Sequence, residues 1–190
     1  MTDPYRQIIA ACLIAFLAYW AWSARRILPP GRSESVVSSL ISNLLMWIGF
    51  ALLALGSLRR FPAIYLVLPV STARSIVGTA LVAIGVGIAI WSRAVLGANW
   101  SRVARIAEGQ QLVTSGPYRF VRNPIYSGIL LAACGVALTS GAMVALLGIP
   151  LVFAALWRKS LVEERLLASE FGERFAAYAR RVKRLIPFVL

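Results

Sequence analysis

Three long apolar segments, each bounded by basic residues, dominate the first half of the chain. They cover residues 8–22, 36–58 and 76–91. A fourth apolar segment, residues 124–157, is far longer than a ~30 Å hydrocarbon core requires at ~1.5 Å per residue, and a Ser-Gly pair at 140–141 offers a turn. We therefore predict two short helices there and about five membrane spans in all. The first segment lacks a small-residue cleavage site and further spans follow, so we interpret it as an anchor and not as a signal peptide.

The C-terminal part has a different pattern, in which apolar residues recur at intervals of three and four. This spacing predicts an amphipathic helix at the membrane surface, interrupted near Gly172. Before the fourth apolar segment, Asn123 and Pro124 have the sequence of a helix N-cap followed by a proline in the first helical position. The apolar residues of the C-terminal stripe are Leu167, Phe171, Phe175, Tyr178, Val182 and Leu185.

Composition supports a membrane protein. Hydrophobic residues make up 59% of the chain and mean hydropathy is +0.77, far above a soluble domain. We expect an all-α, polytopic membrane protein of about five transmembrane helices with a C-terminal amphipathic helical cytoplasmic segment. Residues 1–96 are predicted to be a scaffold of three helices, in which Gly78, Gly85 and Gly87 allow close helix packing. Residues 97–190 are predicted to carry the chemistry.

The charge is strongly positive, with 20 basic and 7 acidic residues and a net charge of +13. Five spans place 16 basic residues on one side and 4 on the other, which predicts a cytoplasmic C-terminus and an N-terminus outside, in the inner membrane if the chain is bacterial. Because the charges border apolar spans, we expect anionic lipid headgroups as partners and no nucleic acid. The oligomeric state is left open.

Several kinds of chemistry are excluded by the residues that the chain lacks or has in the wrong places. There is no histidine, so imidazole catalysis, imidazole metal ligation and Ser-His triads are excluded. The two cysteines, Cys12 and Cys134, lie in apolar segments and form neither a disulfide framework nor a metal-binding spacing. No glycine-rich phosphate loop is present.

Two polar stretches carry the candidate chemistry. In residues 116–128, GPYRFVRNPIYSG, Arg119 and Arg122 precede a predicted helix N-terminus, and together they would suit a carboxylate. Contact with lipid headgroups is the alternative for both arginines. Glu163 and Glu164 follow the last predicted span and could hold an ammonium group of a ligand. The alternative is a helix-surface pair between Lys159 and Glu163.

Three blocks in the second half of the chain resemble the isoprenylcysteine carboxyl methyltransferase family and its phospholipid-methyltransferase-like relatives. The blocks are LGANWS at 96–101, LVTSGPYRFVRNPIYSG at 112–128, and a tail that runs from the Glu163-Glu164 pair through FG at 171–172 to RLIP at 184–187. The resemblance covers about half of the chain, and its specificity lies in the order and spacing of the blocks.

This resemblance implies S-adenosylmethionine as the methyl donor, bound at the cytoplasmic mouth of the bundle. Asn123 stands where the family usually has histidine, and Gln110 stands where relatives often have another. Asparagine can donate a hydrogen bond but cannot act as a titrating base. The cofactor-binding candidates are Tyr118, Arg122, Asn123, Pro124, Tyr126, Gly128, Glu163, Glu164 and Tyr178. The catalytic candidates are Arg122, Asn123, Glu163 and Glu164, and the substrate candidates are Trp100 and Arg119, with no metal.

The implied function is methylation of a lipophilic acceptor, a small molecule or a prenylated chain. Transfer to a carboxylate needs orientation and desolvation but no base, so the absence of histidine favours carboxyl O-methylation of an isoprenylcysteine-like acceptor. An amine acceptor must lose a proton, which a glutamate would have to accept. Phospholipid N-methylation is therefore the first alternative. A catalytically silent membrane protein with a structural or binding role is the second.

Overall fold

Five long helices form the body of the protein and a sixth, short one lies at one end. The structure is a computed structural model that describes residues 3–25, 36–58, 71–100, 111–187 and 189. The α-helices are α1 (Pro4–Ser23), α2 (Val36–Ser57), α3 (Thr72–Leu96), α4 (Pro124–Ser140), α5 (Met143–Phe171) and α6 (Glu173–Arg181), and the 3-10 helices are η2 (Gly97–Asn99) and η3 (Gly116–Arg119).

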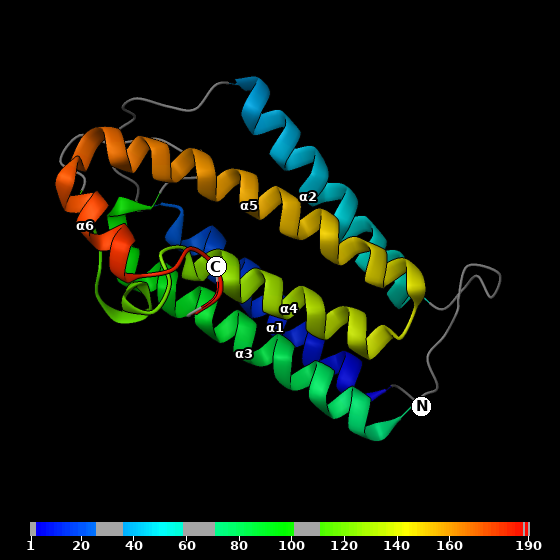
Figure 1. Cartoon of the computed structure of the whole chain (residues 1–190). Coiled ribbons are helices and arrows are strands. Elements are labelled where there is room, and N and C mark those ends of the chain that lie inside the picture. Colours follow the sequence, from blue (N-terminus) through cyan, green and yellow to red (C-terminus); the bar gives the residue numbers. More distant parts are fainter. Residues whose placement is uncertain (1–2, 26–35, 59–70, 101–110, 188, 190) are drawn as a thin grey trace.

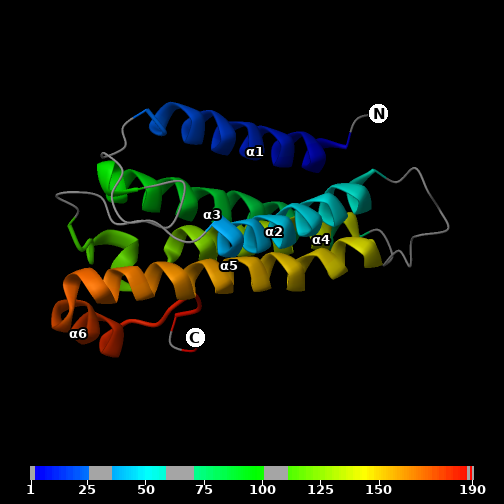
Figure 2. The ribbon, with the colours of Figure 1, turned by 90° about the horizontal axis from the view of Figure 1, so that it is seen from above.

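The five long helices run up and down along one axis, as Figures 1 and 2 show. Helices α1, α2, α3 and α5 are each long and apolar enough to cross a membrane, and α4 is a shorter apolar helix. The predicted all-α membrane fold with about five spans is therefore confirmed. The chain is an integral membrane protein.

Helix α5 corrects one sequence prediction. We expected the second helix of the hairpin to be short and to end near Trp157, but α5 continues for 29 residues to Phe171. Strong helix formers follow Trp157, and the first break comes at Gly172, whose φ of +50° suits glycine best. As a result, Glu163 and Glu164 lie inside α5 and not after it.

The C-terminal stripe is also shorter as a helix than its spacing predicts. The predicted interruption at Gly172 is confirmed, but α6 then covers only nine residues. Val182 is extended and ends this helix. The reason is that the backbone beyond Arg181 hydrogen-bonds to the segment before α4 and does not continue the helical pattern.

Small residues bring α3 and α4 together. A Cβ on Gly85 would lie 2.5 Å from the carbonyl oxygen of Gly128, and one on Gly135 would lie 2.5 Å from that of Gly78, so neither position tolerates a side chain without movement. The predicted packing role is therefore confirmed for Gly78 and Gly85. It is wrong for Gly87, which is exposed and has nothing within 4 Å of its Cβ position.

The two ends of the bundle differ. One end, here called the turn end, holds the N-termini of α1 and α3 and the α4–α5 turn, where Gly141 has a φ of +67°. The other, here called the site end, holds η3, the start of α4, the end of α5, α6 and the tail (Figure 1). The predicted turn at 140–141 is thus confirmed. Gln110 lies outside the described residues.

Candidate functional site

A buried carboxylate lies at the centre of the site end. Glu164 of α5 accepts hydrogen bonds on both carboxylate oxygens from Arg122, at 3.1 and 2.9 Å, and from Arg184, at 3.0 and 2.9 Å. The amide nitrogen of Asn123 adds a fifth bond of 3.0 Å. The side chain of Glu164 is 9% exposed, that of Arg122 is 11% exposed and that of Arg184 is 20% exposed. Two fork-like guanidinium contacts on one buried carboxylate form a strong, directional cluster.

This cluster changes the interpretation of the two glutamates and two arginines. Glu164 is already saturated by donors of its own chain, so the expectation that it holds a ligand's ammonium group is not supported by its contacts. Arg122 points to Glu164 and also donates to the carbonyls of Ala179 and Val182. Arg119 is exposed and lies 4.5 Å over the ring of Phe120. The two arginines therefore do not form the shared carboxylate pocket that their spacing suggested.

Asn123 also departs from its predicted role. It precedes α4, and Pro124 occupies the first helical turn as expected, but the Asn123 side chain makes no cap hydrogen bond. Its amide donates instead to Glu164, at 3.0 Å, and to the carbonyl of Arg184, at 3.3 Å. A cap would require the side-chain oxygen of Asn123 to accept from the N–H groups of the first turn, whereas the side chain is oriented so that its amide nitrogen donates to the buried carboxylate, a strong acceptor.

The C-terminal tail is attached to the start of α4 by backbone as well as side-chain contacts. The amides of Arg122 and Asn123 donate to the carbonyls of Lys183, at 2.8 Å, and Arg184, at 3.0 Å. The hydroxyl of Ser127 donates to the carbonyl of Leu185 at 2.5 Å. Three successive tail carbonyls are thus satisfied by the first turn of α4 and the residues before it, which fixes the register of the tail.

The second glutamate faces a different set of groups. The hydroxyl of Tyr126 on α4 donates to Glu163 of α5 at 2.5 Å. Tyr178 of α6 donates to the carbonyl of Tyr118 at 2.6 Å. Burial raises the pKa of Tyr118, with the negative charge of Glu163 as a further cause, and burial also raises the pKa of Tyr178. Both phenols therefore stay neutral hydrogen-bond donors through the physiological range.

The remaining predicted residues have packing roles. Trp100 packs edge-on against Trp20 of α1. The buried guanidinium of Arg93 lies over the ring of Trp100, 4.5 Å from its centroid. Gly128 packs against α3, and this close contact is enough to explain why the position is glycine; no ligand is needed to explain it. Pro124 is fully buried at the start of α4.

Two important arginines were not among the predicted site residues. Arg184 was recognised only as part of a matching motif, although it supplies half of the guanidinium contacts to Glu164. Arg93 closes the third apolar segment in the sequence, yet it is 2% exposed and donates to the carbonyls of Ser23 and Gly97, each at 2.7 Å. A basic residue two positions after the last apolar one gives a weak signal for such burial.

The fold and the site together define a helical, polytopic membrane protein whose polar cluster is built from the segment before α4, the end of α5 and the tail. The sequence model for the phospholipid methyltransferase family matches residues 73–174, more than half of the chain. The chain therefore belongs to the phospholipid methyltransferase family.

Individual relatives resemble part of the chain. A probable protein-S-isoprenylcysteine O-methyltransferase of Oryza sativa subsp. indica is 31% identical over 118 residues, which is 60% of this chain and 62% of the rice protein. Protein-S-isoprenylcysteine O-methyltransferase of Schizosaccharomyces pombe is 35% identical over 82 residues, 41% of this chain and 34% of its own length. The cobalt-zinc-cadmium resistance protein CzcN of Cupriavidus metallidurans is 39% identical over 77 residues, 40% of this chain and 35% of its own length.

A solved structure shares the fold. The eukaryotic intramembrane Ras methyltransferase ICMT superimposes with a TM-score of 0.55 at 22% sequence identity, over 82% of this chain and 54% of that one. The match spans less than two thirds of each of these proteins, so the resemblance in fold and sequence is to a part of them.

Proposed function

We propose that the chain is an S-adenosylmethionine-dependent methyltransferase that methylates a carboxylate on a lipophilic acceptor, of the isoprenylcysteine kind. The observation that carries the proposal is the Tyr126–Glu163 contact beside the Glu164 cluster, at the end of a membrane bundle and within the segment that matches the family. The names of the plant and yeast relatives agree with this acceptor.

The residues at the site end fit the charges of the cofactor. S-adenosylmethionine carries a cationic sulfonium, an ammonium and a carboxylate, and it supplies an already activated methyl group. Glu163 is a half-buried carboxylate held by a phenol, which suits a cation. Arg122, Arg184 and Glu164 together keep one net positive charge, which suits a carboxylate. The hydroxyls of Tyr118 and Tyr178 already donate to backbone carbonyls, so these neutral rings would contribute by stacking beside them.

We assign different roles to the four catalytic candidates. Glu163 is the residue proposed to face the ligand. Arg122, Asn123 and Glu164 are proposed to hold the tail against α4, and so to keep the mouth of the bundle in one shape. Preorganised geometry of this kind is what an in-line methyl transfer requires, because the electrophile is already activated and only orientation and desolvation are left to supply.

The other predicted residues and the topology belong to the same proposal. Pro124 and Gly128 would shape the floor of the cofactor site through the position of α4, and Trp100 and Arg119 would contact the acceptor. We propose a cytoplasmic site end, an N-terminus outside, and residues 1–96 as scaffold for a methyltransferase core at 97–190. The basic residues support this orientation, because the described ones at the turn end are Arg6 and Arg74 alone.

Methylation of an amine headgroup is the second candidate, and the name of the family favours it. Glu163 would then have to accept a proton from the amine, directly or through its tyrosine partner. A catalytically silent role is the third candidate. The three are separated by one experiment on the purified chain in lipid-containing micelles.

That experiment has two stages. Calorimetry with S-adenosylmethionine and its demethylated product should give saturable binding. Labelled methyl transfer is then measured to a prenylated cysteine acid and to an amine phospholipid in parallel. Transfer to the acid alone supports the proposal and transfer to the amine alone supports the second candidate. Absence of binding at millimolar cofactor would refute any methyltransferase function.

A further inference from the structure

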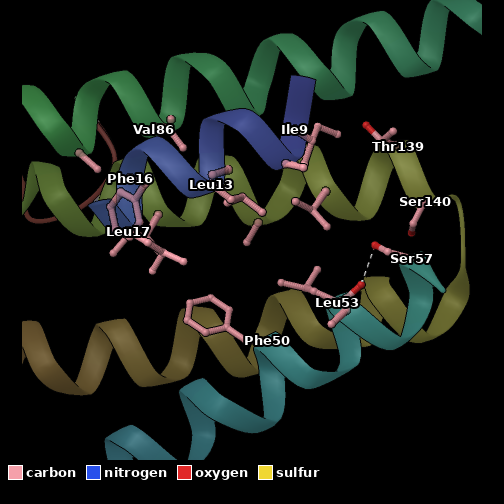
Figure 3. Close-up of a pocket in the computed structure, with 18 of the residues that line it drawn as sticks. Ile9, Leu13, Phe16, Leu17, Phe50, Leu53, Ser57, Val86, Thr139 and Ser140 are labelled. Atoms are coloured by element: carbon pink, nitrogen blue, oxygen red, sulfur yellow. Dashed lines mark hydrogen bonds between the residues drawn. The ribbon is translucent and has the colours of Figure 1, made fainter. Parts of the chain in front are cut away.

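A cavity of about 550 Å³ lies between α1, α2, α3 and α4 (Figure 3), and no residue of the Glu164 cluster lines it. Its volume is within the ~300–1,000 Å³ range of small-ligand sites. It exists because α1 packs mainly against α3, whereas α2 packs mainly against α5, so the space between α1 and α2 is not filled by a helix. None of the predicted site residues except Gly128 lines it.

The cavity is long and almost wholly apolar. Its floor is the α3–α4 seam, where glycine and alanine leave a smooth surface, and its walls are large side chains such as Phe16 of α1 and Phe50 of α2 (Figure 3). Along α4 the lining runs from Gly128 to Ser140, about 18 Å at ~1.5 Å per residue. A single hydrocarbon chain suits this shape.

Polar groups in the lining gather at one end only. Arg6, Ser57, Thr139 and Ser140 all lie at the turn end, and Figure 3 shows the three hydroxyl residues together. At the end nearer the site the lining is apolar. An amphiphile that fits this lining therefore has its polar head at the turn end and its tail directed towards the site, which is opposite to the orientation expected of a methyl acceptor.

The chemistry of the turn end indicates the class of head. Arg6 lines the cavity, with only a partly exposed Asp3 as its ion-pair partner at 3.7 Å. The N-termini of α1, α3 and α5 lie at this end and add partial positive charge, whereas the C-termini of α2 and α4 lie there too and add partial negative charge, so the sign of the head is decided by the full charge of Arg6. The hydroxyls of Ser57 and Thr139 donate to carbonyls of their own helices, at 3.0 and 2.9 Å, so their oxygens are left to accept hydrogen bonds. An anionic phosphate with hydroxyl donors matches this set.

We propose that this cavity is a binding site for an anionic phospholipid with a hydroxylated headgroup, taken from the leaflet at the turn end. One acyl chain lies on the α3–α4 seam between α1 and α2, and the phosphate lies at Arg6. This lipid is separate from the methyl acceptor, and the site does not depend on the proposed enzymatic function.

The test is lipid binding to the full chain in neutral micelles, with phosphatidylglycerol and phosphatidylcholine as probes. Loss of one arginine near the membrane surface should weaken phosphatidylglycerol binding about fivefold in Arg6→Gln. Arg25→Gln, just beyond the opposite end of α1, is the matched control and should bind as wild type. Ala54→Trp, an exposed position that lines the cavity, should abolish binding, whereas Ala51→Trp, exposed on the same helix but outside the lining, should not.

Three results would overturn the proposal. Equal affinity for the two lipids would show that the site does not select an anionic headgroup. Full phosphatidylglycerol binding by Ala54→Trp would show that the lipid does not bind in this cavity. The third is a higher KM for the methyl acceptor in Ala54→Trp with lipid binding unchanged, which would assign the cavity to the acceptor. Thermal melts of all four variants identify any that fail to fold.

Discussion

Removal of the carboxylate of Glu164 is the perturbation for which the structure predicts the largest effect. Glu164→Ala removes five hydrogen bonds, four from the guanidinium groups of Arg122 and Arg184 and one from the amide of Asn123. The two arginine side chains, which are 11% and 20% exposed, then face each other without a counter-charge. Breaking a buried ion pair by removing one partner costs ~3–5 kcal/mol. Because Arg184 is partly solvated, we expect the lower part of this range, about 3 kcal/mol.

A matched control is available on the next helix. Glu173 of α6 pairs with Arg180 at 2.7 Å, but the two side chains are 79% and 66% exposed. An exposed ion pair contributes little, so Glu173→Ala should change the free energy of unfolding by less than ~0.5 kcal/mol. Glu164→Gln keeps the shape of the side chain and removes its charge, and it should fall between the two.

The assay is denaturant unfolding in mixed micelles together with hydrogen exchange of the segment before α4, against which the tail is docked. In Glu164→Ala the amides of Arg122 and Asn123, which donate to tail carbonyls, should lose protection along with the free energy of unfolding. In Glu173→Ala they should not. If the two alanine variants lose the same small amount of stability and keep the same protection, the buried cluster does not hold the tail and the reasoning is wrong.

Three further outcomes follow from other contacts. Tyr126→Phe removes one charge-assisted hydrogen bond at the proposed ligand site, so cofactor titration should show about ten- to a hundredfold weaker binding, and a normal affinity would contradict the role of the pair. Gly135→Ala forces a methyl group against the backbone of α3 and should lower the free energy of unfolding by ~1–3 kcal/mol. In Gly87→Ala the added methyl group has no neighbour within 4 Å, so this variant should be as stable as the wild type or slightly more stable. Equal effects of the two substitutions would argue against close packing of α3 and α4. In a variant without the native cysteines, a cysteine at Gln111 should label from the cytoplasmic side and one at Ser71 from outside, and labelling from one side would refute the five-span topology.

The sequence allowed the spans to be predicted well because each depends on local information. Apolar runs, the glycine at the α4–α5 turn and the Asn-Pro start of α4 act within a few residues, and all three appear in the structure. The end of α5 was mispredicted because a change from apolar to charged residues marks a membrane boundary but does not stop a helix. Gly172 does.

The site was only partly predictable for the opposite reason. The sequence placed Arg122, Asn123 and Glu164 near one another through a family pattern, but it did not indicate that they bind each other. That contact joins residues 42 positions apart, and its third partner, Arg184, lies 20 positions beyond Glu164. Pairing over such distances depends on which faces the helices turn towards each other, and residue spacing along one segment does not contain that information.

The order in which the partners of Glu164 are made has a consequence for biogenesis. Arg122 precedes Glu164 in the chain, but Arg184 follows it by 20 residues, so at ~5–20 residues per second it is synthesised roughly 1–4 s later. During that interval only one of the two cations that bind the carboxylate has been made. Docking of the tail on the first turn of α4 therefore requires that all helices of the bundle have already been synthesised, and it closes the site end. A newly inserted chain is therefore held in the membrane before its site end is complete, and any factor that captures the tail at this stage would delay completion without affecting insertion.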